Sequence, residues 1–149
     1  MKKLLMLALA FVLCACGGPK VTTAETEYVF TDYNSGLEQK VLVSVELEDG
    51  KISKIEIDET YTHDGAQTTK RTLGADYGMK GVSASKGVIP NGGEWNEQID
   101  HLQTQLIGTD GTIALDEAGY PTDEDVKAGC TIYLGVIAEA VKDAVSKAE

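Results

Sequence analysis

The feature that most restricts how this chain can fold is a strict alternation of apolar and polar residues in its first half. Four apolar side chains share one face of an extended segment: Val41, Val43, Val45 and Leu47. Asp49 and Gly50 follow directly, and both tolerate the positive φ that a two-residue hairpin turn requires. Ile55 and Ile57 carry the alternation into a returning strand that reaches Asp58. The pattern predicts a β-hairpin with one apolar face.

A third strand is predicted before this hairpin, because Tyr28 and Phe30 alternate with polar residues up to Asp32. Asn34–Gly36 has the residues of a turn between the two strands. Three antiparallel strands with one apolar face need other elements to cover that face.

Two later segments have the helical spacing that provides such a cover. The first runs from Glu94 to Ile107 and ends before Gly108; its apolar residues lie on one side, at Trp95, Ile99, Leu102 and Leu106. The second runs from Thr131 to Lys147; the apolar residues with helical spacing are Ile137, Val141, Ala144, Val145 and Ala148.

The sequence therefore predicts an α+β fold, in which a small antiparallel sheet is covered by helices. Residues 109–127, between the two helices, are acidic and carry Gly and Pro, so we expect a loop there. We divide the chain into a signal peptide at 1–15, a lipidated cysteine and tether at 16–26, and one domain at 27–149.

The N-terminus has the features of a lipoprotein signal peptide. Lys2 and Lys3 precede an apolar stretch, residues 4–12, that is too short to span a bilayer. Leu13–Cys16 matches a lipobox, in which small residues precede the cysteine that is lipidated after cleavage. We predict that Cys16 is lipidated and that acyl chains hold the protein on a membrane, facing outside the cytoplasm. A plain signal peptide and a membrane-buried helix are the alternatives.

Composition restricts the partners and the chemistry. The net charge is −11, and losing the two lysines of the signal peptide makes it about −13. Such an acidic surface argues against binding nucleic acid. The mature chain keeps a single free thiol, Cys130, so no intramolecular disulfide can form. We expect no metal site, because His63 and His101 lie far apart and the acidic loop lacks the pattern of a calcium loop.

One local feature points to an attachment site. Gly129 and the hydroxyl of Thr131 lie where the acidic loop enters the predicted final helix. Helix N-termini stabilise phosphate, and glycine lets the backbone approach an anion closely. The Thr131 hydroxyl could also carry a phosphate as an ester. The residues alone leave open that Thr131 is an ordinary N-cap.

This stretch resembles the attachment motif of the FMN-binding domain family, found in small extracellular flavin lipoproteins and in subunits of membrane quinone reductases. In that family a flavin transferase, consuming FAD, esterifies FMN to the last hydroxyl of the motif. The resemblance matches Asp125 to the family's acid, Gly129 to its glycine and Thr131 to the flavin-bearing residue. Ala128 stands where the family has Ser or Thr, and Cys130 where it has Ala.

The resemblance extends beyond the motif, to about residues 28–145. Tyr77–Lys80, Gly93–Gln98 and the hairpin that ends in Asp49–Ile52 are similar to segments of the lipoprotein branch, in the same order.

Trp95, Tyr77 and Met79 offer flat or polarizable surfaces that could pack against a flavin ring. Tyr77 and Met79 are candidates, since they lie in a Gly-rich stretch that we expect to be a loop. Trp95 is expected in the core, because it lies in register with the apolar stripe of its helix.

Two functions remain open from the sequence. The first is a surface-tethered flavoprotein that passes electrons between a membrane donor and an outside acceptor, rather than an enzyme with its own substrate. The second is a non-redox lipoprotein that keeps the fold with a degenerate flavin site, as Ala128 and Cys130 suggest. A redox-responsive Cys130 is a further alternative to a buried, inert thiol.

Overall fold

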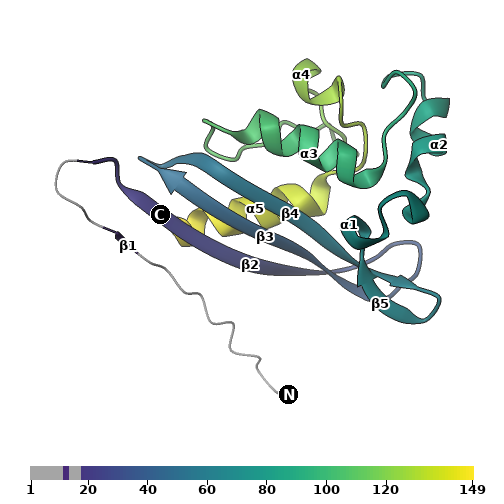
Figure 1. The fold of residues 1–149 in the computed structure, drawn as a ribbon, viewed down its shortest axis with the longest axis horizontal. Helices are drawn as coiled ribbons and strands as arrows, with labels where there is room; N and C mark the ends of the chain where they lie inside the picture. Colours follow the sequence, from purple (N-terminus) through teal and green to yellow (C-terminus); the bar gives the residue numbers. More distant parts are fainter. Residues whose placement is uncertain (1–11, 14–17) are drawn as a thin grey trace.

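The computed structural model describes Val12, Leu13 and residues 18–149, and it confirms the predicted α+β fold (Figure 1). Its strands are β1 (Val12–Leu13), β2 (Val21–Thr31), β3 (Glu38–Glu48), β4 (Lys51–His63) and β5 (Ala66–Thr69). Its helices are α1 (Lys70–Leu73), the 3-10 helix η1 (Gly74–Tyr77), α2 (Met79–Ser85), α3 (Trp95–Leu106), α4 (Glu124–Lys127) and α5 (Gly135–Ala148). Neighbouring strands follow the order of the sequence and are antiparallel. Since β1 belongs to the predicted signal peptide, the other four strands form the sheet of the predicted domain.

The predicted hairpin is confirmed. Asp49 and Gly50 both adopt positive φ, 50° and 77°, between β3 and β4. Strand β3 buries every second residue, and its apolar face is the one that the alternation predicted.

Strand β2 is longer than predicted, so the tether predicted to reach residue 26 is wrong in its last part. The strand begins at Val21, and Ala24 and Thr26 are buried. The hydroxyl of Thr26 accepts a hydrogen bond from Nζ of Lys147 on α5, at 2.6 Å. Small and polar residues suit this strand because α5 packs closely against it, and the sequence pattern did not show that neighbour.

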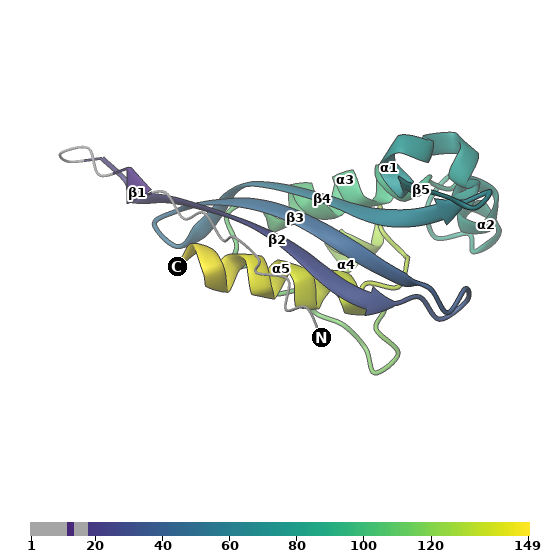
Figure 2. The same ribbon diagram turned by 90° about the horizontal axis from the view of Figure 1, so that it is seen from below.

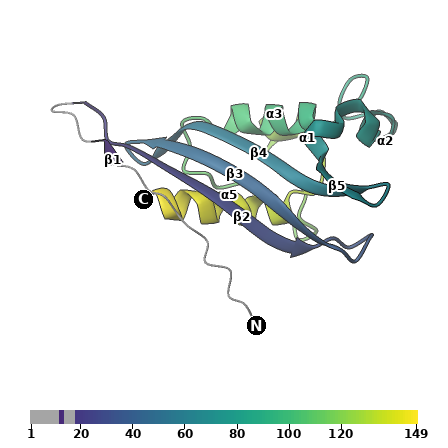
Figure 3. The ribbon, with the colours of Figure 1, turned by 60° about the horizontal axis from the view of Figure 1, so that its bottom comes forward.

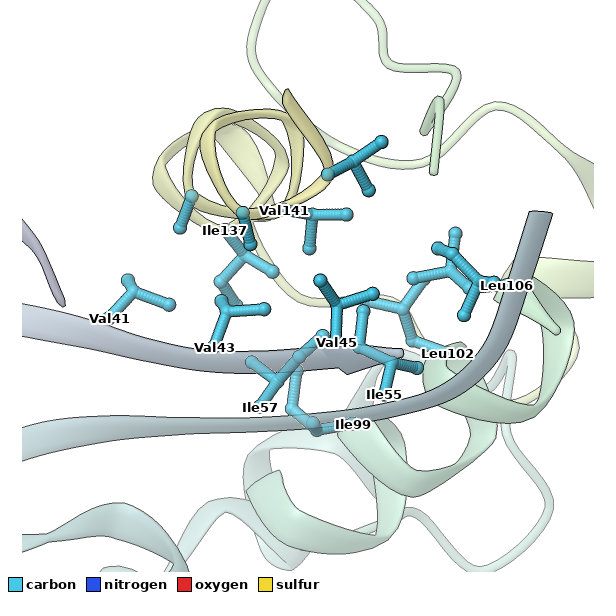
Figure 4. Packing of buried hydrophobic residues seen from close by; sticks show 14 of the residues in the cluster. Val41, Val43, Val45, Ile55, Ile57, Ile99, Leu102, Leu106, Ile137 and Val141 are labelled. Carbon is cyan, nitrogen blue, oxygen red and sulfur yellow. The ribbon is translucent and has the colours of Figure 1, made fainter. Parts of the chain in front are cut away.

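The core lies between one face of the sheet and two helices. Helix α5 packs along β2 and β3, and α3 packs beside β4 (Figure 2, Figure 3). Apolar side chains from both helices and from β3 and β4 meet in one cluster (Figure 4). The positions predicted for both helices are buried, including Trp95 at 2% exposure. A capping box formed by Glu94 and Glu97 begins α3.

The two ends of the sheet differ. The C-terminal end of α5 lies near the start of β2, and α2 and β5 lie at the other end (Figure 1). The chain that follows the predicted lipid anchor therefore enters the sheet at the end remote from α2.

Burial on α3 predicts a difference between two isoleucines. Ile99 is fully buried, whereas Ile107, just after the helix, is 48% exposed. Ile99→Ala should lower the free energy of unfolding by about 2–5 kcal/mol, because it leaves a cavity between α3 and the sheet. Ile107→Ala is the matched control and should change it by less than about 0.5 kcal/mol. Urea unfolding measures both values, and equal losses would contradict this description of the core.

Candidate functional site

The segment that carries Thr131 connects α4 to α5, and α5 begins four residues later than predicted. The helix starts at Gly135. Leu134 is fully buried, and its amide donates to the carbonyl of Gly119 at 2.8 Å. This tertiary contact keeps the chain out of the helix until Gly135, so Thr131 is not the N-cap of the final helix.

The side-chain amide of Gln98 holds Thr131 in place. Oε1 of Gln98 accepts the backbone amide of Thr131 at 2.9 Å and lies 3.4 Å from its hydroxyl oxygen. Nε2 of Gln98 donates to the carbonyl of Gly93 at 2.9 Å. Gln98 is 1% exposed, so this bridge is shielded from water, while Thr131 is half-buried. The Thr131 hydroxyl thus lies beside Gln98 on a fixed, half-buried stretch of backbone.

Gly129 is required by packing against α3. A methyl group on Gly129 would lie 2.3 Å from Cγ of His101. Nε2 of His101 lies 2.7 Å from the carbonyl oxygen of Asp125. Because a carbonyl only accepts, this nitrogen carries the proton. His101 and Gln98 are one turn apart on α3, and they contact Asp125 in α4 and Thr131 in the segment that follows.

The amides next to Thr131 already have partners. Those of Gly129 and Cys130 both donate to the carbonyl of Val126, at 3.2 and 2.8 Å, and that of Thr131 donates to Gln98. These three amides do not form the phosphate cradle that a helix N-terminus at Thr131 would have supplied. What the segment offers to a phosphate is the Thr131 hydroxyl.

Two motif positions face solvent on α4. Asp125 lies in the helix and Ala128 directly after it, and both are exposed. Asp123 caps α4, because its Oδ1 accepts the amides of Asp125 and Val126. The acidic loop predicted over residues 109–127 therefore ends in a short capped helix.

Cys130 lies inside the core. Its side chain is fully buried, and burial raises the pKa of the thiol to about 11. A thiol in this state is a weak nucleophile at neutral pH.

Tyr77 and Met79 are not in a loop as predicted. Tyr77 ends η1 and Met79 begins α2, and both are partly buried against the core. Gly78 between them has a φ of 78°, which lets one short helix turn into the next. The amide of Met79 donates to Glu94 at 2.9 Å, so this stretch also contacts the start of α3.

Tyr77 belongs to a cluster around a buried ion pair. Nζ of Lys70 lies 2.7 Å from Oε1 of Glu59, and the two side chains are 12% and 7% exposed. The ammonium also lies 5.1 Å from the ring centre of Tyr77 and 5.5 Å from that of Trp95. Tyr61 packs edge-on against Tyr77. Burial raises the pKa of Glu59. Burial alone would lower the pKa of Lys70, but the nearby Glu59 carboxylate outweighs it and the pKa of Lys70 is raised. The Tyr77 ring thus packs against these neighbours and is partly buried.

Two exposed tyrosines close to Thr131 were missed by sequence reasoning. Tyr133 is 49% exposed and Tyr120 is 40% exposed, and their rings meet edge-to-face with centres 6.1 Å apart. Nζ of Lys86 lies 5.5 Å from the ring centre of Tyr120. The three residues come from three separate segments, so no spacing in the sequence brings them together.

Cys16 lies outside the residues that the structure describes. Among the described residues, no helix is both long and apolar enough to cross a bilayer. Within the same residues, no group of three or more His, Cys, Asp or Glu side chains is placed to hold a metal ion. Comparison with protein families, with characterised proteins and with solved structures finds no match to this chain.

Burial of Cys130 predicts a pH dependence of stability. Because the folded protein raises the pKa of the thiol from 9.0 to about 11, the fold favours the protonated form. The contribution of the protonated thiol to the free energy of unfolding is complete below pH 9. It is lost as the pH rises through 11, and the loss amounts to about 2 kcal/mol at pH 11. Urea unfolding at pH 8 and pH 11 measures this loss. Between the two pH values, the free energy of unfolding of the wild type should fall by about 2 kcal/mol more than that of Cys130→Ala. The same loss in both proteins would show that the thiol is not buried in this way.

Proposed function

We propose that this chain is an exported lipoprotein, anchored through Cys16, that carries FMN esterified to the hydroxyl of Thr131 and transfers electrons outside the cytoplasm. The observation that carries the proposal is the arrangement at Gln98, which fixes the backbone of the half-buried Thr131 and lies 3.4 Å from its hydroxyl oxygen. The resemblance of residues 125–131 to a flavin-attachment motif supplies the chemical identity of the group.

The residues present fit a covalent attachment better than a bound phosphate. Thr131 supplies the ester oxygen, and Ala128 and Gly129 are small enough to leave it open to a flavin transferase. The amides of Gly129, Cys130 and Thr131 are already bonded, so they are not free to hold a phosphate. A phosphate without an amide cradle binds weakly, and an ester would keep the cofactor attached in its place.

FMN, when bound, supplies the redox chemistry, and the chain supplies attachment and electrostatics. The mature net charge of about −13 would speed encounters with cationic acceptors and slow those with anionic ones. The electron donor, the acceptor and the transferase are the partners that this function requires.

The fold separates the proposed flavin from the proposed anchor. The chain from Cys16 joins β2 near the C-terminal end of α5, and the Thr131 segment precedes the other end of that helix (Figure 1). A helix of 14 residues is about 21 Å long. The flavin would therefore lie away from the point of attachment, where partners outside the membrane can reach it.

A second candidate function is a non-redox lipoprotein that keeps this fold with a degenerate flavin site. The exposed methyl group of Ala128 favours it, because the family has a hydroxyl at that position. The fold and core are the same in both cases, so only cofactor attachment separates them.

Flavin attachment is tested on a denaturing gel. The chain is expressed with a flavin transferase and FAD, and the band is examined for flavin fluorescence. We expect a fluorescent band for the wild type and for Thr122→Ala, which removes the hydroxyl of another exposed threonine. Thr131→Ala should abolish the fluorescence, because the ester oxygen is lost.

The degenerate-site alternative predicts a different result from the same gel. A dark wild-type band together with a fluorescent Ala128→Ser band would reject the electron carrier for this chain and support loss of the site.

A further inference from the structure

Tyr133 has a fixed ring with one exposed side. A methyl group on Gly119 would lie 2.3 Å from Cε2 of Tyr133, and one on Gly135 would lie 2.3 Å from its hydroxyl oxygen. The ring therefore rests on the bare backbone of two glycines. The bond from the Leu134 amide to the Gly119 carbonyl holds these two stretches of backbone together. Almost half of the residue is still exposed, at 49%. An exposed aromatic ring that is held this closely is already ordered before any ligand arrives.

Tyr120 and Lys86 extend this surface. The Tyr120 ring meets Tyr133 at 78°, and the ammonium of Lys86 lies 5.5 Å from the Tyr120 ring centre. We call Tyr120, Tyr133 and Lys86 the tyrosine platform. It combines two polarizable rings with a positive charge, which suits a flat ring that gains negative charge.

The tyrosine platform lies within reach of the proposed ester. Thr131 and Tyr133 are two residues apart, so their Cα atoms are separated by at most about 7 Å. The phosphate and ribityl chain of FMN can span that distance. Tyr77, which the sequence predicts for this role, instead packs against Lys70 and Tyr61.

We propose that the isoalloxazine ring of FMN attached at Thr131 lies on Tyr133, with Tyr120 beside it and Lys86 at its edge. This inference rests on the proposed flavin attachment. Tyr133 and Tyr120 position the ring, and Lys86 favours its reduced, more negative form. The platform gives the flavin a defined place on a chain in which the amides of Gly129, Cys130 and Thr131 are not free to hold its phosphate.

Flavin fluorescence tests the contact, because a phenol ring stacked on isoalloxazine quenches its emission. In the detergent-purified, flavinylated protein, Tyr133→Leu and Tyr120→Leu should each raise the emission per flavin at least about twofold. Tyr33→Leu is the matched control and should leave it unchanged, since Tyr33 is 98% exposed in the turn between β2 and β3. Tyr120→Leu keeps the test valid if loss of the Tyr133 ring unfolds the protein. Emission equal to the control in both platform variants would overturn the proposal.

A second arm separates this inference from the proposed function. Thr131→Cys is placed in the full chain with Cys14→Ser and Cys16→Ser, and is labelled with a thiol-reactive riboflavin. Cys130 should stay unlabelled in the folded protein because it is fully buried. Quenching that depends on Tyr133 in this protein supports the platform even if the transferase leaves Thr131 unmodified, a result that would reject only the proposed function. Unquenched emission in the labelled protein, unaffected by Tyr133→Leu, counts against the platform.

Discussion

A buried amide side chain, that of Gln98, joins two stretches of backbone that are far apart in the sequence. It accepts a hydrogen bond from the amide of Thr131 and donates one to the carbonyl of Gly93, and the side chain itself is 1% exposed. Without it, the buried carbonyl of Gly93 and the half-buried amide of Thr131 would lose their partners, at a cost of about 1–3 kcal/mol for the buried group. The position of the Thr131 hydroxyl depends on this bridge, because α5 does not begin until Gly135 and so cannot fix it.

Helix α3 organises the site more than the final helix does. Glu94 at its start contacts the amide of Met79, Gln98 binds Thr131, and the ring of His101 fills the space beside Gly129. The bond from Thr131 to Gln98, with those from Gly129 and Cys130 to the carbonyl of Val126, occupies the three amides at the attachment motif. A group added at Thr131 would thus be held in place by its covalent bond and by nearby side chains. This is consistent with an exported carrier, which cannot easily reload a cofactor that dissociates.

The sequence predicted most of the fold and less of the site, for physical reasons. Helix α3 and the hairpin at Asp49 and Gly50 were found because periodicity and turn chemistry are local signals. The start of α5 was misplaced because the contact from Leu134 to Gly119 is long-range and leaves no pattern. Helix α2 was missed, since glycines flank and interrupt it. The meeting of Tyr120 and Tyr133 likewise depends on the packing of distant segments.

Amide hydrogen exchange at Thr131 tests the central role of Gln98 most directly. The account predicts slow exchange in the wild type, and at least about tenfold faster exchange in Gln98→Ala, because the bond that protects the amide is lost. The amide of Cys130, which bonds to Val126, is the internal control and should keep its protection. Equal exchange of the Thr131 amide in both proteins would contradict the account.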